Sequence, residues 1–324
     1  FWSMIDSPVY VYCDYDCDGI TSGSIISIGC NSIGIKPHII IPRRFTDGYG
    51  IKIKNLENMD PSGLLITVDN GIAANEAVDA AKEKGMKVII LDHHEARILN
   101  GERFLPEADV VIDPHITEAD FEDYCGAGLA YRFMREVFAK KRRPADLNGI
   151  MSSMIALAAV GTIGDSVTMK AENRFLVRRG MEQIEQRRVS TGLALLLEEM
   201  ELSDTLSVED IAYSLVPAIN AFGRLEDEGS RKVAALLSYN GRKSDGAKNA
   251  AQIVKQMNDE RKTYCKELTE LAEKMVEETG QMNNSVLVLQ DNRFLKGICG
   301  IIAGNLTEKY KVPSIVFGAP ENGI

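Results

Sequence analysis

In the first part of the chain, apolar residues form short continuous runs, and stretches with helical spacing separate these runs. Such continuous runs are typical of strands that are buried on both faces of a parallel sheet. The predicted strands are residues 9–12, 38–41, 64–68, 87–91 and 110–112. Between them, helical spacing predicts helices at residues 21–33, 73–84 and 128–140. This alternation predicts an α/β domain built on a parallel sheet with crossover helices.

The rest of the chain predicts a second, smaller α/β domain. Residues 151–197 have helical spacing, and the polar, acidic residues 198–207 have the composition of a linker. Beyond them we predict a long charged helix at 244–278, a glycine-rich turn into a helix at 297–309, and strands at 285–289 and 313–317. We therefore expect a first domain at 1–197, a linker at 198–207 and a second domain at 208–324, with a cleft between the two domains.

Composition and charge narrow the class of protein. The 324 residues carry a formal net charge of −10, which argues against a passive nucleic-acid coat, because such proteins are basic. An acidic chain still fits an enzyme whose carboxylates hold cations. The six cysteines form no CxxC pair, which predicts reduced thiols and a cytoplasmic protein. The sequence predicts neither a signal peptide nor a transmembrane helix.

Aspartates follow four of the predicted strands. Strands 64–68, 87–91 and 110–112 run into Asp69, Asp92 and Asp113. The first strand leads into a short segment with three more: Asp14, Asp16 and Asp18. Ligand sites of open parallel sheets lie at the carboxyl ends of the strands, so we expect these acids at one edge of the sheet.

So many carboxylates at one edge predict bound cations, because neighbouring like charges raise one another's pKa. Oxygen ligands with an imidazole favour Mn²⁺ or Mg²⁺ over a structural zinc site. Two other readings remain open. The Asp-x-Asp-x-Asp-Gly spacing is similar to an EF-hand calcium loop, but Ile25 stands where that loop needs glutamate. Cys13 and Cys17 are candidate soft ligands in the same segment.

The tripeptide Asp92-His93-His94 is the sharpest local signal. It follows a predicted buried strand and contains half of the four histidines of the chain. Two adjacent histidines beside a carboxylate suit one metal ligand and one side chain that faces the substrate. We therefore predict His93 and His94 as functional residues.

These motifs resemble the DHH superfamily of phosphoesterases, and in particular its RecJ-type single-strand DNA exonucleases. The matching segments are residues 11–21 around Asp14, 65–72 around Asp69, 92–94, 160–167 with Asp165, 217–225 with Asn220 and Arg224, and 297–304 with Gly300 and Gly304. Their order and spacing cover nearly the whole chain. One departure is Tyr12, at a position where many members of the superfamily carry a metal-binding histidine.

The resemblance implies a parallel-sheet DHH domain, a DHH-associated domain and two divalent cations, with Mn²⁺ ahead of Mg²⁺. It implies that Asp16, Asp69 and, as a third candidate, Asp14 hold one cation. The second would be held by Asp18, Asp69, His93 and Asp165, so that Asp69 bridges both. The implied catalytic residues are His94 and the neighbouring Asp92.

The expected activity is 5′-to-3′ hydrolysis of single-stranded DNA, with no role for a membrane. The predicted substrate-binding residues are Arg43, Asn220, Arg224, Gly300 and Gly304. Arg43 and Arg224 are candidates for gripping a terminal phosphate, because guanidinium groups bind phosphate with two parallel hydrogen bonds. A surface salt bridge is the alternative role for each arginine.

Two other functions stay open. A DHH phosphodiesterase of short oligonucleotides or cyclic dinucleotides would share the same metal centre. Such enzymes carry a Gly-Gly-Gly-His element, where this chain has Gly297-Ile-Cys-Gly300. An inactive relative that serves as a scaffold would have lost metal ligands, whereas this chain keeps the acids and both histidines of the motifs.

Overall fold

The computed structural model contains one five-stranded parallel sheet near the N-terminus. It describes residues 1–324 apart from 2–3, 5, 117–118, 141–142, 203–204 and 319–324. The strand order is β2-β1-β3-β4-β7, and every neighbouring pair is parallel. The strands are β1 (Val9–Cys13), β2 (His38–Ile40), β3 (Leu64–Val68), β4 (Lys87–Leu91) and β7 (Val110–Ile112). The predicted parallel sheet and its five strands are confirmed.

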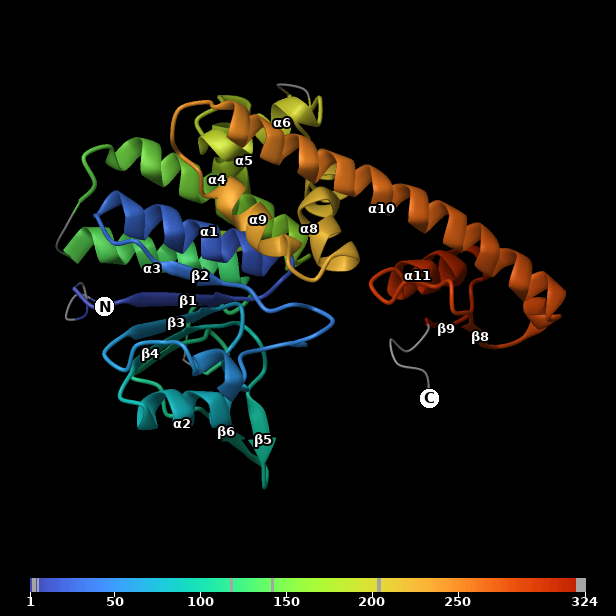
Figure 1. The fold of residues 1–324 in the computed structure, drawn as a ribbon, viewed down its shortest axis with the longest axis horizontal. Coiled ribbons are helices and arrows are strands. Elements are labelled where there is room, and N and C mark those ends of the chain that lie inside the picture. Colours follow the sequence, from blue (N-terminus) through green and yellow to red (C-terminus); the bar gives the residue numbers. More distant parts are fainter. Residues whose placement is uncertain (2–3, 5, 117–118, 141–142, 203–204, 319–324) are drawn as a thin grey trace.

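Helices cover both faces of this sheet (Figure 1). One face packs on α1 (Cys17–Ser32) and α3 (Gly126–Lys140), and α4 (Leu147–Gly164) and α5 (Ala171–Glu185) lie behind them. The other face packs on α2 (Asn75–Glu83) and the 3₁₀ turn η2 (Ile53–Leu56). Strands that are covered on both sides explain the continuous apolar runs of the sequence.

Helix α4 is long and apolar enough to cross a membrane by length and composition. However, 61% of its apolar window is buried inside the protein. It packs against α1, α3 and α5. Helix α4 is therefore apolar because it forms part of the protein core.

Two local features differ from the predicted elements. Helix α1 begins at Cys17 rather than at residue 21, because the side chain of Asp16 caps its N-terminus. The segment after β4 forms an antiparallel hairpin of β5 (Arg97–Leu99) and β6 (Glu102–Phe104), which we did not predict. Its turn has Asn100 at φ 54° and Gly101 at φ 86°, the backbone that an Asn-Gly pair favours.

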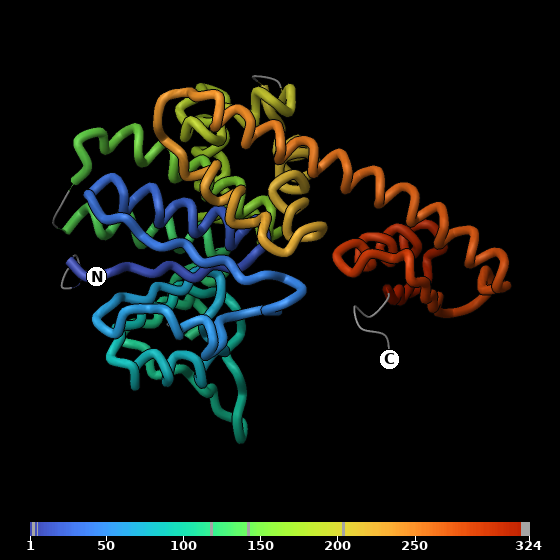
Figure 2. Tube along the Cα trace, in the orientation of Figure 1, coloured from blue at the N-terminus to red at the C-terminus, as the bar shows by residue number. Residues whose placement is uncertain are grey.

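The C-terminal half is mainly helical. It contains α6 (Thr191–Glu199), α7 (Val208–Asp210), a π-helical turn η3 (Ile211–Leu215), α8 (Val216–Leu225), α9 (Gly229–Leu237) and α10 (Asp245–Glu278). After α10 come η4 (Gln281–Asn283), β8 (Leu287–Gln290), α11 (Cys299–Tyr310) and β9 (Ser314–Phe317). Strands β8 and β9 pair in parallel. Figures 1 and 2 show this small unit at the far end of α10, next to the C-terminus.

The hydrophobic cores show how the two halves are joined. The core that covers the sheet extends through α8 and α9 to Val254 in the first half of α10. A separate core begins at Leu268 and ends at Leu306 in α11. The division at residues 198–207 stays a prediction, since residues 203–204 lie outside the described part and the change of core occurs within α10. The cleft between two domains likewise stays a prediction.

Candidate metal centre

The first cluster of acids lies where β1 runs into α1. The Asp16 carboxylate accepts a hydrogen bond from the backbone N–H of Gly19 at 3.1 Å. The buried Asp18 carboxylate accepts from the N–H groups of Gly126 at 2.6 Å and Ala127 at 2.8 Å. These N–H groups begin helix α3, and the positive end of a helix dipole stabilises an anion. Two helix N-termini therefore fix these two side chains.

Asp69 follows β3 in a left-handed backbone conformation, with φ 58°. Its N–H donates to the carbonyl of Leu91 at 2.9 Å, which extends the pairing of β3 with β4. A Cβ atom at Gly126 would come within 2.7 Å of the Asp69 side chain, so glycine at position 126 allows α3 to approach. Asp69 is buried at the centre of the carboxyl edge.

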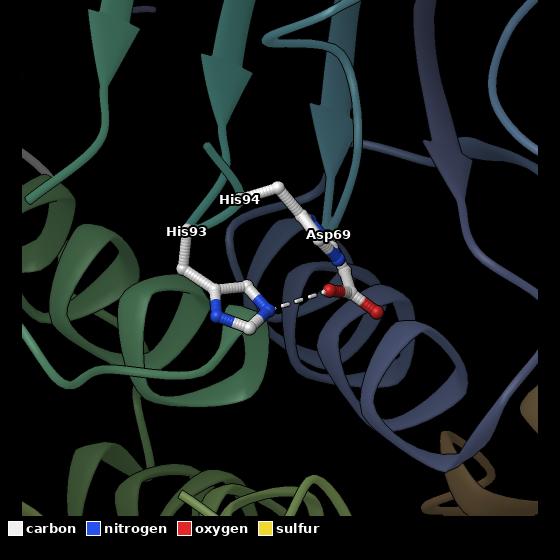
Figure 3. Close-up of side chains that lie close together, drawn as sticks. All are labelled: Asp69, His93 and His94. Atoms are coloured by element: carbon white, nitrogen blue, oxygen red, sulfur yellow. Dashed lines mark hydrogen bonds and ion pairs between the residues drawn. The ribbon is translucent and has the colours of Figure 1, made fainter. Parts of the chain in front are cut away.

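His93 reaches the same point from β4. Its Nε2 atom lies 3.1 Å from Asp69 Oδ1, a contact that Figure 3 shows. The same nitrogen lies 3.7 Å from Asp18 Oδ2 and 3.8 Å from Asp165 Oδ2. Asp165 comes from the C-terminal end of α4, far from β4 in the sequence. One imidazole nitrogen therefore lies among three carboxylates from three different elements.

The six predicted metal ligands fall into two separate groups, and a third group of Asp69, His93 and His94 shares one residue with each of them. Within each group, one potential ligand atom per residue lies within 4.8 Å of the others. The first group is Asp14, Asp16 and Asp69, and the second is Asp18, His93 and Asp165. The contact between Asp69 and His93 joins them. This arrangement matches the two sets implied by the sequence motifs, and the role of each residue as a ligand stays a proposal.

The electrostatics of the cluster suit divalent cations. The buried Oδ1 atom of Asp14 has no hydrogen-bond partner among the described residues. Burial and the charge of Asp16 raise the pKa of Asp14 to about 7. Burial and the charges of Asp18 and Asp16 raise the pKa of Asp165 to about 7 and that of Asp69 well above its ordinary value. Hard cations would bind these oxygens and remove the repulsion, so the residues fit Mn²⁺ or Mg²⁺.

His94 has a different environment. Its Nδ1 atom lies 2.7 Å from Asp92 Oδ1, and this carboxylate also accepts from the N–H groups of His93 and Ile72. Burial would raise the pKa of Asp92, but the hydrogen bonds from His94 and the backbone hold it below its ordinary value. In turn, the hydrogen bond to Asp92 raises the pKa of His94 to about 8. Asp92 therefore orients His94 and favours its protonated form.

The predicted substrate-binding residues are more dispersed. Arg43 pairs with Asp47, whose Oδ2 lies 3.2 Å from Arg43 Nε. Arg224 is half-buried at the end of α8, and its Nη1 group donates to the carbonyl of Gly297 at 3.2 Å. Gly300 and Gly304 lie on the exposed side of α11, with open space where a Cβ atom would be.

Asn220 is half-buried on α8, and its Oδ1 atom has no hydrogen-bond partner within the described part of the chain. The structure thus brings the predicted metal ligands together. It places the predicted substrate residues on three separate elements.

One residue of this region, Tyr49, was missed by the sequence analysis. The Tyr49 hydroxyl lies 3.3 Å from His94 Nε2, and the two rings meet edge to face. The guanidinium of Arg44 lies 5.0 Å from the centre of the Tyr15 ring, beside the first acids. Tyr49 is flanked by Gly48 and Gly50, both at positive φ, and this Gly-Tyr-Gly turn was a usable signal.

The raised pKa values predict how metal binding and stability depend on pH. Asp14 and Asp165 titrate at about 7 in the folded protein, whereas aspartate in an unfolded chain titrates near ~4. Without metal, the folded protein therefore holds more protons between these values, and its stability falls as the pH rises from ~4 to ~7. Since Mn²⁺ would bind the ionised carboxylates, the gain in Tm on adding Mn²⁺ is expected to be larger near pH ~8 than near pH ~5.

Thermal unfolding with and without Mn²⁺ at the two pH values checks this prediction. The Asp165→Asn variant should lose most of the gain at the higher pH. An equal gain at both pH values would show that protons and metal do not compete for these carboxylates.

Comparisons with known proteins agree with the motifs. Residues 8–162 match the model of the DHH family, N-terminal domain. The single-stranded-DNA-specific exonuclease RecJ of Bacillus subtilis is 31% identical over 321 residues, which is 97% of this chain and 38% of that protein.

Two solved structures are similar to the whole fold. The crystal structure of exonuclease RecJ bound to manganese has a TM-score of 0.80 and 26% identity, and the match covers 96% of this chain and 75% of that one. RecJ from Thermus thermophilus in complex with Mn²⁺ has a TM-score of 0.76 and 26% identity, over 95% of this chain and 43% of that one. The chain spans 38% to 56% of the length of the curated relatives it matches.

Proposed function

The chain belongs to the DHH family, and from this membership we propose that it is a two-metal phosphodiesterase that degrades single-stranded DNA from a 5′ end. The observation that carries the proposal is the meeting of two candidate ligand groups at one edge of the sheet, joined by the contact between Asp69 and His93. The retention of this complete set of acids supports an enzyme rather than a scaffold.

In this proposal Asp14, Asp16 and Asp69 hold one cation, and Asp18, Asp69, His93 and Asp165 hold the other. Bound divalent cations would activate a water molecule and stabilise the charge on the scissile phosphate. Burial lowers the pKa of His93, so its imidazole is neutral and able to act as a ligand.

His94 has a separate role in the proposal. It is held by Asp92 and is cationic near neutral pH, so it donates a hydrogen bond to the phosphate or a proton to the leaving oxygen.

A cluster of arginines supports recognition of a terminal phosphate. Burial lowers the pKa of Arg224, and the nearby charges of Arg44 and Arg261 lower it further. Positive charges that act on one another in this way favour the binding of an anion nearby. We include Arg44 among the residues proposed to bind the terminal phosphate, because its charge also acts on the Asp14 carboxylate. Arg43 remains a candidate for a second contact, for which it would have to leave Asp47.

Arg224→Ala is expected to weaken binding of 5′-phosphorylated strands by about tenfold to a hundredfold, because a charge-assisted hydrogen bond contributes about 1.5–3 kcal/mol. Binding of 5′-hydroxyl strands should change little, so the advantage of the phosphate disappears. Binding assays with both kinds of strand measure this difference. Arg178→Ala, which removes an exposed arginine of α5, is the matched control. A loss of affinity that is equal for both kinds of strand would exclude recognition of the terminal phosphate.

The experiment that tests the proposed function follows strands labelled at either end in the presence of Mn²⁺. Cleavage from the 5′ end releases a 5′ label at once and shortens 3′-labelled strands step by step. Circular single strands and cyclic dinucleotides are incubated in parallel and should remain intact. Shortening from the 3′ end alone, or cleavage of circles as fast as linear strands, contradicts the proposed polarity. Preferential hydrolysis of cyclic dinucleotides would favour a small-substrate phosphodiesterase.

A further inference from the structure

A loop at residues 43–50 connects β2 to the 3₁₀ turn η2. Gly48 and Gly50 have φ 76° and φ 73°, and Cβ atoms built on them would meet nothing within 4 Å. The backbone of the loop is therefore not held by packing at these two positions.

Asp227 supplies the contact between this loop and the C-terminal half of the chain. Its Oδ1 atom accepts from the backbone N–H of Phe45 at 2.8 Å, and its Oδ2 atom accepts from the hydroxyl of Thr46. The residue lies in the short connection between α8 and α9, more than 180 positions further along the chain. Both oxygens of one carboxylate are thus used to hold two successive residues of the loop.

The side chains on either side of this anchor reach the candidate catalytic site. Arg44, just before Phe45, lies over the ring of Tyr15, between Asp14 and Asp16 in the sequence. Tyr49 places its hydroxyl 3.3 Å from Nε2 of His94. On the outer side, the ammonium group of Lys296 lies 5.7 Å from the centre of the Phe45 ring.

The far end of the loop has its own contact with the sheet: the hydroxyl of the buried Tyr12 in β1 donates to the carbonyl of Gly50 at 3.2 Å. Asp227 therefore holds the first part of the loop, around Phe45 and Thr46.

The ion pairs of the loop are weaker constraints. Arg43 pairs with Asp47 within the loop itself, so this pair does not fix the loop to the body. Lys54 reaches Asp47 at 2.8 Å, and Arg43 lies 3.9 Å from Glu228, but the lysine and the glutamate side chains are 50% and 78% exposed. Exposed ion pairs contribute little because water screens them. Asp227 instead accepts from a backbone N–H, whose direction is fixed by the chain, and from a neighbouring hydroxyl.

We propose that Asp227 is a positioning residue that holds loop 43–50 over the metal centre, so that Arg44 and Tyr49 are in place before the nucleic acid strand binds. The inference rests on the proposed function, since it concerns binding of a strand at this centre. Asp227 contacts none of the candidate metal ligands. Its loss therefore lowers affinity for the strand and leaves metal binding intact.

The test is Asp227→Ala, assayed for Mn²⁺-dependent degradation of single-stranded DNA. KM is expected to rise about tenfold, the factor that corresponds to loss of one hydrogen bond to a charged group. The kcat value should stay within about twofold, and the Tm gain with Mn²⁺ should equal that of the wild type. Thr46→Val removes the hydroxyl from the other side and should reproduce part of the rise in KM. In the double variant the two effects should not add, because both substitutions break the same contact.

Glu226→Ala is the matched control, since it truncates the neighbouring exposed acid, which pairs with Lys232 and not with the loop. Hydrogen exchange at the Phe45 amide gives a readout that needs no activity: protection is expected in the wild type and lost in Asp227→Ala. An unchanged KM with Asp227→Ala, additive effects in the double variant, or a Phe45 amide that exchanges equally in both proteins overturns the inference. If the Phe45 amide of the wild type is protected from exchange but the protein degrades no strand, the proposed function is wrong. The role of Asp227 in holding the loop would still be supported.

Discussion

Asp69→Asn is expected to lower the rate of strand cleavage by at least ~1000-fold without unfolding the protein. Asp69 is the acid that contacts His93 and also belongs to the group with Asp14 and Asp16, so its loss affects both proposed cations. Asparagine is the replacement of choice because it tolerates a positive φ better than alanine does, and Asp69 has φ 58°. Steady-state cleavage of labelled single strands in Mn²⁺ measures the loss.

The control for this variant is Asp79→Asn, which removes an exposed carboxylate on α2. It should keep full activity. The metal-free Asp69→Asn protein should unfold at or above the wild-type temperature, since burial and repulsion from Asp18 and Asp16 disfavour the Asp69 anion. If the Asp69→Asn variant were active, the Asp69 carboxylate would not be the ligand shared by the two proposed cations.

The second large effect is expected at His94. His94→Gln should lower kcat by about 100-fold to 1000-fold, with a smaller change in metal affinity, because it removes the donor that we propose for the reacting phosphate. The pKa of His94 is raised to about 8 through its hydrogen bond to Asp92, so activity should fall as the pH rises through about 8. Asp92→Asn removes the anion that raises this pKa and should move the fall to lower pH. Profiles of kcat against pH for the three proteins test both statements.

His38→Gln is the matched control for this series, because His38 lies exposed on the edge strand β2 and stacks on Tyr10. Its pH profile should overlay that of the wild type. A His94→Gln variant with normal kcat, or an Asp92→Asn profile that does not move, would remove His94 from the proton-transfer role.

The sheet and its acids were predictable because the signals are local. A run such as Leu64–Val68 reads as a buried strand, and the residue after a parallel strand lies at the carboxyl edge whatever the rest of the chain does. Asp69 and Asp92 could therefore be assigned to one edge from their position alone. Asp165 could not be assigned to this edge from its position, because it follows a helix, α4, that is brought to the site by packing. Only the family motif pointed to it.

What the sequence did not reveal depends on contacts between distant segments. Asp18 is fixed by the N-terminus of α3, more than a hundred residues away, and Asp227 holds loop 43–50 from an even greater distance. Neither of these contacts produces a periodic pattern in the sequence. The long helix α10 was predicted as one element, but its two halves serve different cores, which no pattern of charge or spacing along it indicates.

The central claim is that two divalent cations share the edge of the sheet around Asp69. Crystals grown with Mn²⁺, measured at the manganese absorption edge, test it most directly. We expect two anomalous peaks roughly 3.5–4 Å apart, with Asp69 between them. Asp14 and Asp16 should lie beside one peak, and Asp18, His93 and Asp165 beside the other. A single peak, or peaks that lie away from Asp69, would contradict it.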